Sequence, residues 1–413
     1  MKTNIIAITD LEHSSPRIPN LLFHLDSKRY NKYIIGANYD EFLSKDDLPS
    51  ELENEVRIIT FKRNINLFKS IKAKVSQTKF ENKHNRSTYL LLKRIFLKLL
   101  LNLLIPDQYV YTIFRYRHLF DKNFSNTSNT VIISSSPYPS SHIAAYLIKR
   151  KNEKITWISD FRDLWSLNHA YNLSRFRLKI DRLIEKKIIS KTDLITTVSA
   201  PWVEKMKILH NKKTELIRNG YSEIEFKKDT NSIIPDNKKI NILYVGSLYF
   251  DFQDIDMLFD SIDNPSLAKI EIHFIGNFSS ELQEQIETKN LQNHIKQLGK
   301  FSRLESIQIQ SNYDYLLFFD FKNDDGVLLL KFYEYLYANK PIICIGSNTS
   351  TEHKKILRDL NRSIILENKN QIKHFFKNEI HSHNITVDKT KTTEYSYRNQ
   401  SQKLDKVLQN LIK

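Results

Sequence analysis

Short apolar runs that alternate with helical patterns are the feature that most constrains the fold of this 413-residue chain. In the second half, apolar runs near 241–245, 271–275, 315–319 and 342–345 alternate with helical patterns near 254–261, 280–288, 303–310 and 327–338. Gly246, Gly276 and Gly346 each follow such a run. Uniformly apolar runs of this length are typical of buried parallel strands. A glycine at the end of a strand lets a ligand approach the backbone closely.

The first half has the same rhythm. Its candidate strands are 4–8, 33–35, 56–61, 130–134, 155–159 and 194–198, and its helical patterns include 141–150 and 176–189. The alternation predicts an α/β protein with two Rossmann-like, doubly wound parallel-sheet domains, at 1–220 and 241–392. The charged segment 221–240 is expected to be a linker, and 393–413 a helix that returns to the first domain. We expect the two sheets to face each other across a cleft, with ligands at the carboxyl ends of the strands.

The composition limits the partners and the compartment. Lysine and arginine number 63 against 47 acidic residues, a net charge of +16, which favours an anionic partner: nucleic acid, an acidic membrane surface or phosphorylated ligands. The single cysteine, Cys344, excludes a disulfide framework. No run of 18 apolar residues occurs and the first apolar run soon meets Asp10, so we expect a cytoplasmic location. The seven glycines include no G-x-G-x-x-G motif, which argues against a dinucleotide-dependent dehydrogenase.

The segment 324–343 carries the strongest local pattern. Asp-Asp-Gly at 324–326 predicts a helix start, and Asn-Lys-Pro at 339–341 predicts its end before an apolar strand. Lys331 and Glu334 are three residues apart and therefore share a helix face. Backbone amides at the helix start would suit a pyrophosphate, and Glu334 could accept hydrogen bonds from ribose hydroxyls. The same two side chains could instead form an ordinary ion pair on a solvated helix.

This pattern has a family resemblance. Lys-x-x-Glu-Tyr-Leu at 331–336, followed by Lys-Pro and an apolar strand, resembles the donor-binding helix of GT-B glycosyltransferases, and most closely that of retaining glycosyltransferase family 4, which uses nucleotide sugars. Two glutamates usually stand eight residues apart in that family; the second matches Glu334 and the first falls on Gly326. Asp-Phe-Arg-Asp-Leu-Trp at 160–165 resembles the Asp-Phe-Arg-Asp-Pro-Trp signature of a bacterial polysaccharide-assembly subset, with Leu164 in place of proline.

The resemblance implies a retaining transfer of sugar from a nucleotide-diphosphate sugar to a glycan or lipid-linked saccharide in bacterial surface polysaccharide (lipopolysaccharide or capsule) biosynthesis, without a metal cofactor. The residues expected to bind the donor are Gly246, Ser247, Gly276, Lys300, Arg303, Gly326, Val327, Leu328, Lys331 and Glu334. Those expected on the acceptor side are Glu12, His13, Ser135, Ser136, Asp160 and Arg162. Catalytic roles are expected for Asp160, Arg162, Lys331 and Glu334.

Several of these residues have an alternative structural interpretation. Asp160 and Arg162 could form a pair that braces the strand–helix turn, the serines near 135 could cap a helix, and His13 could be a surface histidine. Asp-Ile-Asp at 254–256 resembles a metal-binding pair but fits a helix start.

A very basic segment suggests a membrane partner. Eleven basic residues and one acid, Glu81, occupy 62–98, and an apolar run continues to 105. The segment 62–105 is too short and too charged to span a bilayer, but it could lie on an anionic membrane surface; it could also be a first-domain helix with basic flanks. Three other functions remain open: a nucleotide-sugar epimerase of the same fold, a non-catalytic partner of another transferase, and a nucleic-acid-binding protein. The last is not expected, because no recognised nucleic-acid module is present.

Overall fold

The computed structural model describes residues 2–11, 16–38, 54–62, 105–125, 127, 129–168, 173–225, 235, 238–278, 280–361, 363–380 and 390–412. The chain divides into two compact units. The first comprises Met1–Thr197, Val203–Leu216 and Asp405–Lys413, and the second comprises Val198–Trp202 and Ile217–Leu404. Most of the predicted linker, and most of the basic segment 62–105, lie outside the described residues.

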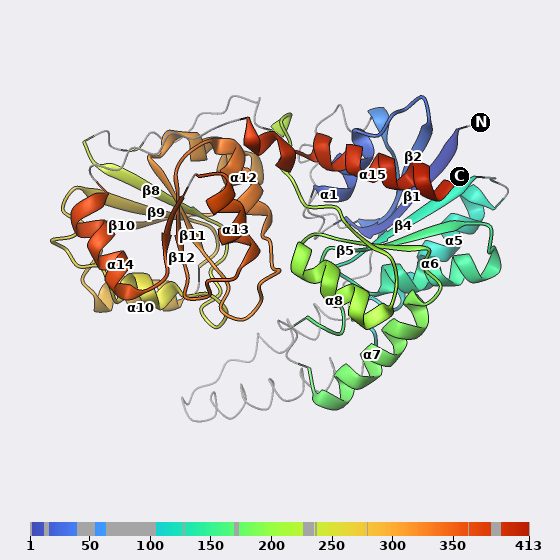
Figure 1. Ribbon diagram of the computed structural model, residues 1–413, viewed down its shortest axis with the longest axis horizontal. Coiled ribbons are helices and arrows are strands. Elements are labelled where there is room, and N and C mark those ends of the chain that lie inside the picture. Colours follow the sequence, from blue (N-terminus) through green and yellow to red (C-terminus); the bar gives the residue numbers. More distant parts are fainter. Residues whose placement is uncertain are drawn as a thin grey trace, which may run out of the picture. The chain divides into compact units, whose positions relative to one another are not determined.

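The first unit holds a parallel sheet whose described strands run in the order β3-β2-β1-β4-β5-β6-β7 (Figure 1). The strands are β1 (Thr3–Asp10), β2 (Tyr30–Asn38), β3 (Arg57–Lys62), β4 (Thr130–Ser135), β5 (Thr156–Phe161), β6 (Leu194–Thr197) and β7 (Thr214–Leu216). The helices are α1 (Arg17–Phe23), α5 (Thr112–Phe124), α6 (Ser140–Lys151) and α7 (Arg175–Ile189). Helix α8 (Ala200–His210) belongs to this unit from Val203 onward, and α15 (Tyr397–Ile412) ends here. The apolar run of β1 is fully buried from Ile5 to Ile8, as a central parallel strand requires.

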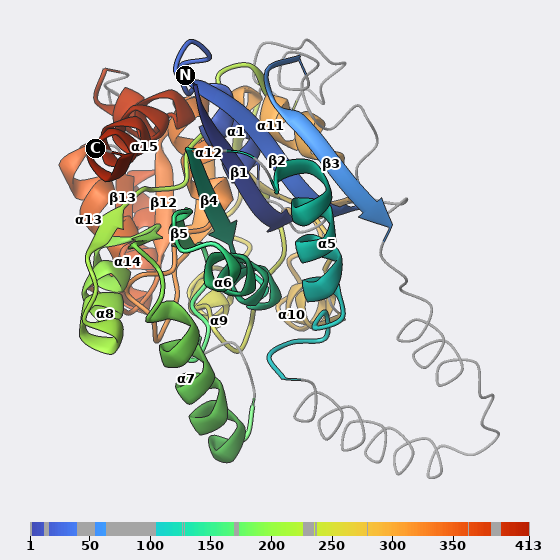
Figure 2. The same ribbon diagram turned by 90° about the vertical axis from the view of Figure 1, so that its right-hand side faces the viewer.

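The C-terminal end of α15 belongs to this unit. Asp405 accepts hydrogen bonds from Tyr30 Oη at 2.7 Å and Arg29 Nη1 at 3.3 Å, and Leu408 is fully buried. The last turns of the helix are therefore fixed by contacts with the start of β2. Figure 2 shows this helix beside the first strands of the sheet.

The second unit holds a parallel sheet whose described strands run in the order β10-β9-β8-β11-β12-β13. They are β8 (Ile240–Val245), β9 (Ile270–Ile275), β10 (Ile295–Gly299), β11 (Tyr315–Phe319), β12 (Ile342–Ile345) and β13 (Ser363–Leu366). The helices are α9 (Ile255–Phe259), α10 (Ser280–Thr288), α11 (Arg303–Ile309), α12 (Leu330–Ala338), α13 (Glu352–Asp359) and α14 (Lys369–His374), with short helical turns at Gln310–Asn312, Phe375–Glu379 and Lys391–Tyr395.

Helices cover both faces of this second sheet. One apolar cluster joins the sheet to α9, α10 and α14, and another joins it to α11, α12 and α13. The predicted class, two doubly wound parallel sheets, is confirmed. The prediction omitted β7, β10 and β13, each of which lies at an edge of its sheet. An edge strand needs fewer apolar residues than a central one, as in the half-exposed Ile-Lys-Gln-Leu-Gly of β10.

A buried histidine connects α6 to the first sheet. His142 Nδ1 lies 2.8 Å from Ser134 Oγ, which accepts a hydrogen bond from Trp157 Nε1 at 2.8 Å. The indole N–H can only donate, so Ser134 Oγ accepts from Trp157 and shares a further hydrogen bond with His142 Nδ1. Burial lowers the pKa of His142 from 6.5 to about 3.

This histidine should make the protein sensitive to acid. The unfolded chain binds a proton near pH 6.5, whereas folded His142 resists protonation until about pH 3. Its contribution to the free energy of unfolding is therefore complete above pH 6.5 and is lost as the pH falls toward 3. The free energy of unfolding should fall by no more than about 1.4 kcal/mol per pH unit from this one group. Urea unfolding between pH 7 and 4 should show a shallower decline for His142→Gln than for wild type. Equal slopes would contradict the assignment.

Candidate functional site

The carboxyl end of the second sheet opens with two glycines in contact. Gly246 follows β8 with φ 104°, and Gly276 follows β9 with φ 151°. A Cβ atom on Gly276 would lie 2.5 Å from the carbonyl oxygen of Gly246. Gly246 N–H donates to the carbonyl of Ile275 at 2.7 Å. Only glycine fits position 276. The two loops present their backbone at the carboxyl ends of the inner strands β8 and β9.

Lys331 reaches this glycine loop from α12. A Cβ atom on Gly246 would lie 3.8 Å from Lys331 Nζ. Lys331 Nζ donates to Tyr244 Oη at 2.5 Å and lies 3.8 Å from the centroid of the same ring; Tyr244 Oη in turn donates to the carbonyl of Ser247 at 2.7 Å. Burial lowers the pKa of Lys331 to about 7, against the opposing attraction of Glu334. Tyr244 thus positions both the amine and the loop that follows β8.

Glu334 occupies the next turn of α12 and is 6% exposed. Its Oε1 accepts from Arg303 Nη2 at 2.8 Å, and Arg303 Nη1 lies 2.7 Å from Glu225 Oε2. Burial opposes the charge of Arg303, but the two carboxylates outweigh it and raise the pKa of Arg303. Within the described residues, the partner of Glu334 is therefore Arg303, not Lys331, so the solvated ion-pair alternative does not describe this helix. Glu334 Oε2 has no hydrogen bond among the described contacts and could accept one from a ligand.

The tyrosine of the same motif fixes α12 to the sheet. Tyr335 Oη accepts from the backbone N–H of Val245 at 2.8 Å, and Tyr333, Tyr335 and Leu336 are fully buried. Asn339 then ends the helix in the left-handed conformation, at φ 58°. The predicted helix end is confirmed, and the motif Lys-x-x-Glu-Tyr presents its charged residues beside the end of β8.

The loop before α12 differs from the prediction. The helix begins at Leu330, so Gly326, Val327 and Leu328 precede it, and the helix start predicted at 324–326 is wrong. The reason is local: Asp324 Oδ1 accepts from the backbone N–H of Gly326 at 2.9 Å, which forms a separate turn. Asp324 Oδ1 also accepts from Trp202 Nε1 at 3.1 Å.

Trp202 packs against Gly326 and leaves no room for a side chain there. A Cβ atom on Gly326 would lie 2.3 Å from Trp202 Cδ1 and 2.8 Å from Ser199 Oγ. No side chain fits at 326 unless the indole moves. The indole therefore fills the space beside Gly326, the position at which the sequence resemblance would place a glutamate.

Gly326→Glu should accordingly destabilise the protein. We expect a loss of about 1–3 kcal/mol in the free energy of unfolding from overpacking. In the background Trp202→Ala, the same substitution should cost at least about 1 kcal/mol less, because the two residues are in contact. Urea unfolding of both single variants and the double variant measures this coupling; additive losses would contradict the predicted clash.

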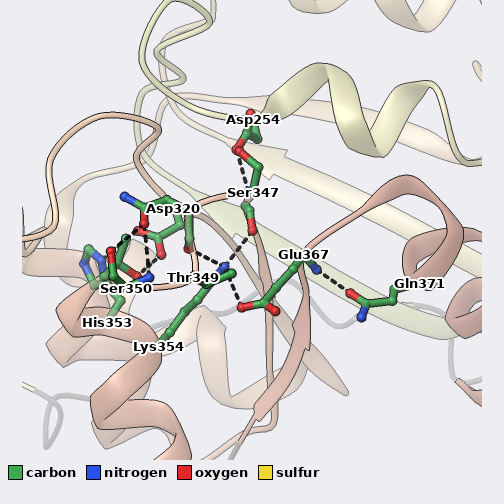
Figure 3. Close-up of polar contacts among 12 residues, drawn as sticks. Asp254, Asp320, Ser347, Thr349, Ser350, His353, Lys354, Glu367 and Gln371 are labelled. Carbon is green, nitrogen blue, oxygen red and sulfur yellow. Dashed lines mark hydrogen bonds and ion pairs between the residues drawn. The ribbon is translucent and has the colours of Figure 1, made fainter.

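A buried lysine holds the loop after β12 (Figure 3). Lys354 Nζ donates to the carbonyls of Gly346 and Asn348, each at 2.6 Å, and pairs with Glu367 at 3.2 Å. The Asp254 carboxylate of the Asp-Ile-Asp segment accepts from the backbone N–H and the hydroxyl of Ser347 at 2.7 and 2.6 Å. Asp254 thus fixes this loop.

A second set of contacts joins that loop to the end of β11. Asp320 is fully buried and accepts from the Thr351 hydroxyl and from His353 Nδ1, the latter at 3.0 Å. Asn348 Nδ2 donates to Asp325 Oδ1 at 2.8 Å. Burial alone would raise the pKa of Asp320, but His353 and Thr351 bring it below its ordinary value. The loop that contains Gly326 is therefore tied through Asp325 to Asn348, in the loop that the buried Lys354 holds.

In the first unit, Asp160 is engaged on both oxygens. It is 2% exposed and accepts from Arg17 Nε and Nη2 at 3.1 and 2.8 Å, from Ser135 Oγ at 2.7 Å and from Thr196 Oγ1 at 2.8 Å. Burial alone would raise the pKa of Asp160, but these partners bring it below its ordinary value. The contacts match the structural interpretation, with Arg17 rather than Arg162 as the partner.

Arg162 and Ser136 shape the neighbouring loop. Arg162 lies 3.4 Å from Asp163 Oδ2. The Ser136 hydroxyl accepts from the backbone N–H of Asp163 at 3.1 Å and donates to its carbonyl at 3.0 Å. Asp107 fixes the start of α6 through the backbone N–H and the hydroxyl of Ser140. Serine hydroxyls therefore hold the loops after β4 and β5 together.

The other predicted residues are less informative. Lys300 is exposed after β10, and Glu12 and His13 lie outside the described residues. The sequence interpretation missed Tyr244, Glu225, Arg17 and Trp202. The position of Tyr244 two residues before Gly246 was an available signal, whereas Arg17 lies 143 residues from Asp160 and had none. No described helix is both long enough and apolar enough to span a bilayer.

No protein-family model and no curated protein sequence matches the chain. Solved structures resemble the chain. Sucrose-phosphate synthase from Thermosynechococcus elongatus superposes with a TM-score of 0.64, at 11% identity over 99% of each chain. A glycosyltransferase from Rickettsia africae ESF-5 gives 0.61 at 11% identity over 100% of this chain and 99% of that one. The chain has the GT-B fold. A structure from E. coli, described as trehalose-6-phosphate bound with UDP-2-fluoro glucose, gives 0.62 at 11% identity over 98% and 99%.

Proposed function

We propose that the chain is a glycosyltransferase that moves a sugar from a nucleotide-diphosphate sugar onto a glycan or lipid-linked saccharide in bacterial surface polysaccharide biosynthesis. The observation that carries the proposal is the arrangement in the second unit, where Lys331 and Glu334 lie on successive turns of α12 beside the exposed Gly246 loop. The GT-B fold, shared with a structure that holds a UDP-sugar analogue, supports the same class of ligand.

The proposed roles follow from charge and reach. Glu334 accepts hydrogen bonds from the ribose hydroxyls, with Arg303 holding its other oxygen. Lys331 and the amides of Val327 and Leu328 neutralise the diphosphate, whose negative charge grows as the bond to the sugar breaks; the Gly326 N–H is already bonded to Asp324. Gly246 and Gly276 allow the diphosphate to approach the backbone.

We propose retention by displacement on one face of the sugar. The acceptor oxygen bonds to the anomeric carbon as the bond from that carbon to the diphosphate breaks, and the acceptor proton passes to an oxygen of the departing diphosphate. In the first unit, Asp160 and Ser135 act by positioning the loops after β4 and β5, and Arg162 contributes to the acceptor side. The basic segment 62–105 would keep the enzyme on the inner face of the membrane.

A ligand screen with a turnover assay tests this function. One class among UDP-, GDP-, ADP- and CMP-linked sugars should raise the melting temperature of wild type by mass action. The increase should be lost in Glu334→Gln and kept in Glu284→Gln, an exposed glutamate on α10. Sugar transfer should require an added acceptor. Failure of every nucleotide sugar to bind would overturn the proposal, and rapid, complete conversion of the donor alone would identify an epimerase instead.

A further inference from the structure

Two large apolar side chains project from α7. Phe176 is 75% exposed and Leu183 is 70% exposed. Seven residues separate them, which is two helical turns, so both lie on the same face of the helix. A single exposed apolar side chain is ordinary on a protein surface, but two aligned on one helix face form a patch.

Basic side chains surround this pair. The exposed basic residues of α7 are Arg175, Lys179, Arg182, Lys186 and Lys187. At 3.6 residues per turn, these five and the two apolar residues fall within an arc of about 140°. No acidic side chain in the described part of the chain pairs with any of the five.

The acids of α7 are directed away from this arc and buried. Asp181 pairs with Arg177 at 2.8 Å. Glu185 accepts from the backbone N–H of Ser166 at 2.9 Å and lies 3.1 Å from His210. Both acidic residues of the helix therefore make internal contacts. The exposed face within the arc carries only basic and apolar side chains.

We propose that this face of α7 docks on an anionic lipid membrane. The basic groups match lipid phosphates, at about 1 kcal/mol for each one near the surface, while Phe176 and Leu183 enter the boundary between headgroups and acyl chains. The phosphates of a nucleic acid would pair with the basic side chains but would offer no apolar surface for Leu183. The segment 62–98 of this chain carries eleven basic residues and one acid, so like charge disfavours it as the occupant. The proposal is independent of the transferase reaction.

Vesicle binding by the full chain tests the proposal. Wild type should bind phosphatidylcholine vesicles containing about one third phosphatidylglycerol more tightly than pure phosphatidylcholine, with salt weakening the binding. The pair Lys179→Glu and Lys186→Glu should lower the partition coefficient roughly tenfold or more, as should Phe176→Ser with Leu183→Ser. Ile208→Ser is the matched control, because Ile208 is 85% exposed but its helix carries a Glu204–Lys207 ion pair nearby. It should bind within about twofold of wild type.

A direct readout separates α7 from any other membrane-binding segment. Tryptophan at position 176, made by Phe176→Trp, should be quenched by brominated lipids, and Ile208→Trp should not. Vesicle binding unchanged in both double variants, or an unquenched Phe176→Trp, would overturn the proposal. The proposal would also be overturned if the α7 double variants lost binding to double-stranded DNA or to tRNA but still bound vesicles. Melting curves equal to that of wild type show that each variant is folded.

Discussion

Replacing Lys331 by methionine is expected to lower kcat for sugar transfer by about 10²–10³-fold, the effect of removing one positioned donor from a developing anion. Methionine keeps the length and the apolar stem but removes the charge that lies beside Gly246 and Tyr244. The loss should fall mainly on kcat, because the diphosphate carries more charge in the transition state than in the bound donor. Steady-state kinetics with saturating acceptor measures it.

The matched control is Lys355→Met, at an exposed lysine of α13 in the same unit. It should change kcat by less than about twofold. A Lys331→Met enzyme with the turnover of Lys355→Met would show that the leaving diphosphate is neutralised elsewhere.

The ionisation of Lys331 adds a pH dependence to the same prediction. Because burial lowers the pKa of Lys331 to about 7, the free protein loses this cation as the pH rises through 7. Donor affinity should therefore fall between pH 6 and pH 8, with a proton taken up on binding near neutrality. Calorimetry in buffers of different ionisation enthalpy measures both. A profile unchanged in Lys331→Met would assign the titration to another group.

Asp160→Ala is expected to reduce the free energy of unfolding by about 3–5 kcal/mol, because it leaves the Arg17 guanidinium buried without its partner. Asp163→Ala is the control: its carboxylate is 39% exposed and pairs with Arg162 at 3.4 Å, so its loss should cost no more than about 1 kcal/mol. Urea unfolding compares the two. An Asp160→Ala protein as stable as Asp163→Ala but inactive would favour a direct role toward the acceptor instead.

Sequence periodicity predicted the central strands and the edge strand β3, but it missed the other three described edge strands, β7, β10 and β13. Central parallel strands such as β1 and β11 are buried on both faces and so are uniformly apolar. β10 and β13 combine polar or exposed positions with short lengths, and nothing local distinguishes them from loops. The start of α12 was misplaced because Asp324 satisfies the N–H of Gly326 in a turn of its own.

The candidate site was predictable only where its residues are neighbours in sequence. The spacing of Lys331 and Glu334 identified one helix, and Gly246 identified the strand end that it faces. The partner of Asp160, Arg17, is brought in by tertiary packing alone. Arg303 was expected to bind the donor, but it bridges two glutamates, one of which, Glu225, lies in the chain segment between β7 and β8. Such partners depend on long-range geometry that no local pattern encodes.

The contact between Gly276 and Gly246 has a consequence for attempts to alter donor preference by mutagenesis. The atoms that a methyl group at 276 would meet belong to the main chain, so no rotamer change elsewhere can make room for it. A substitution there would displace Gly246 at the end of β8, and with it the backbone beside Lys331, the amine proposed to neutralise the diphosphate. Libraries aimed at new donors should hold this position constant and diversify the surrounding loops.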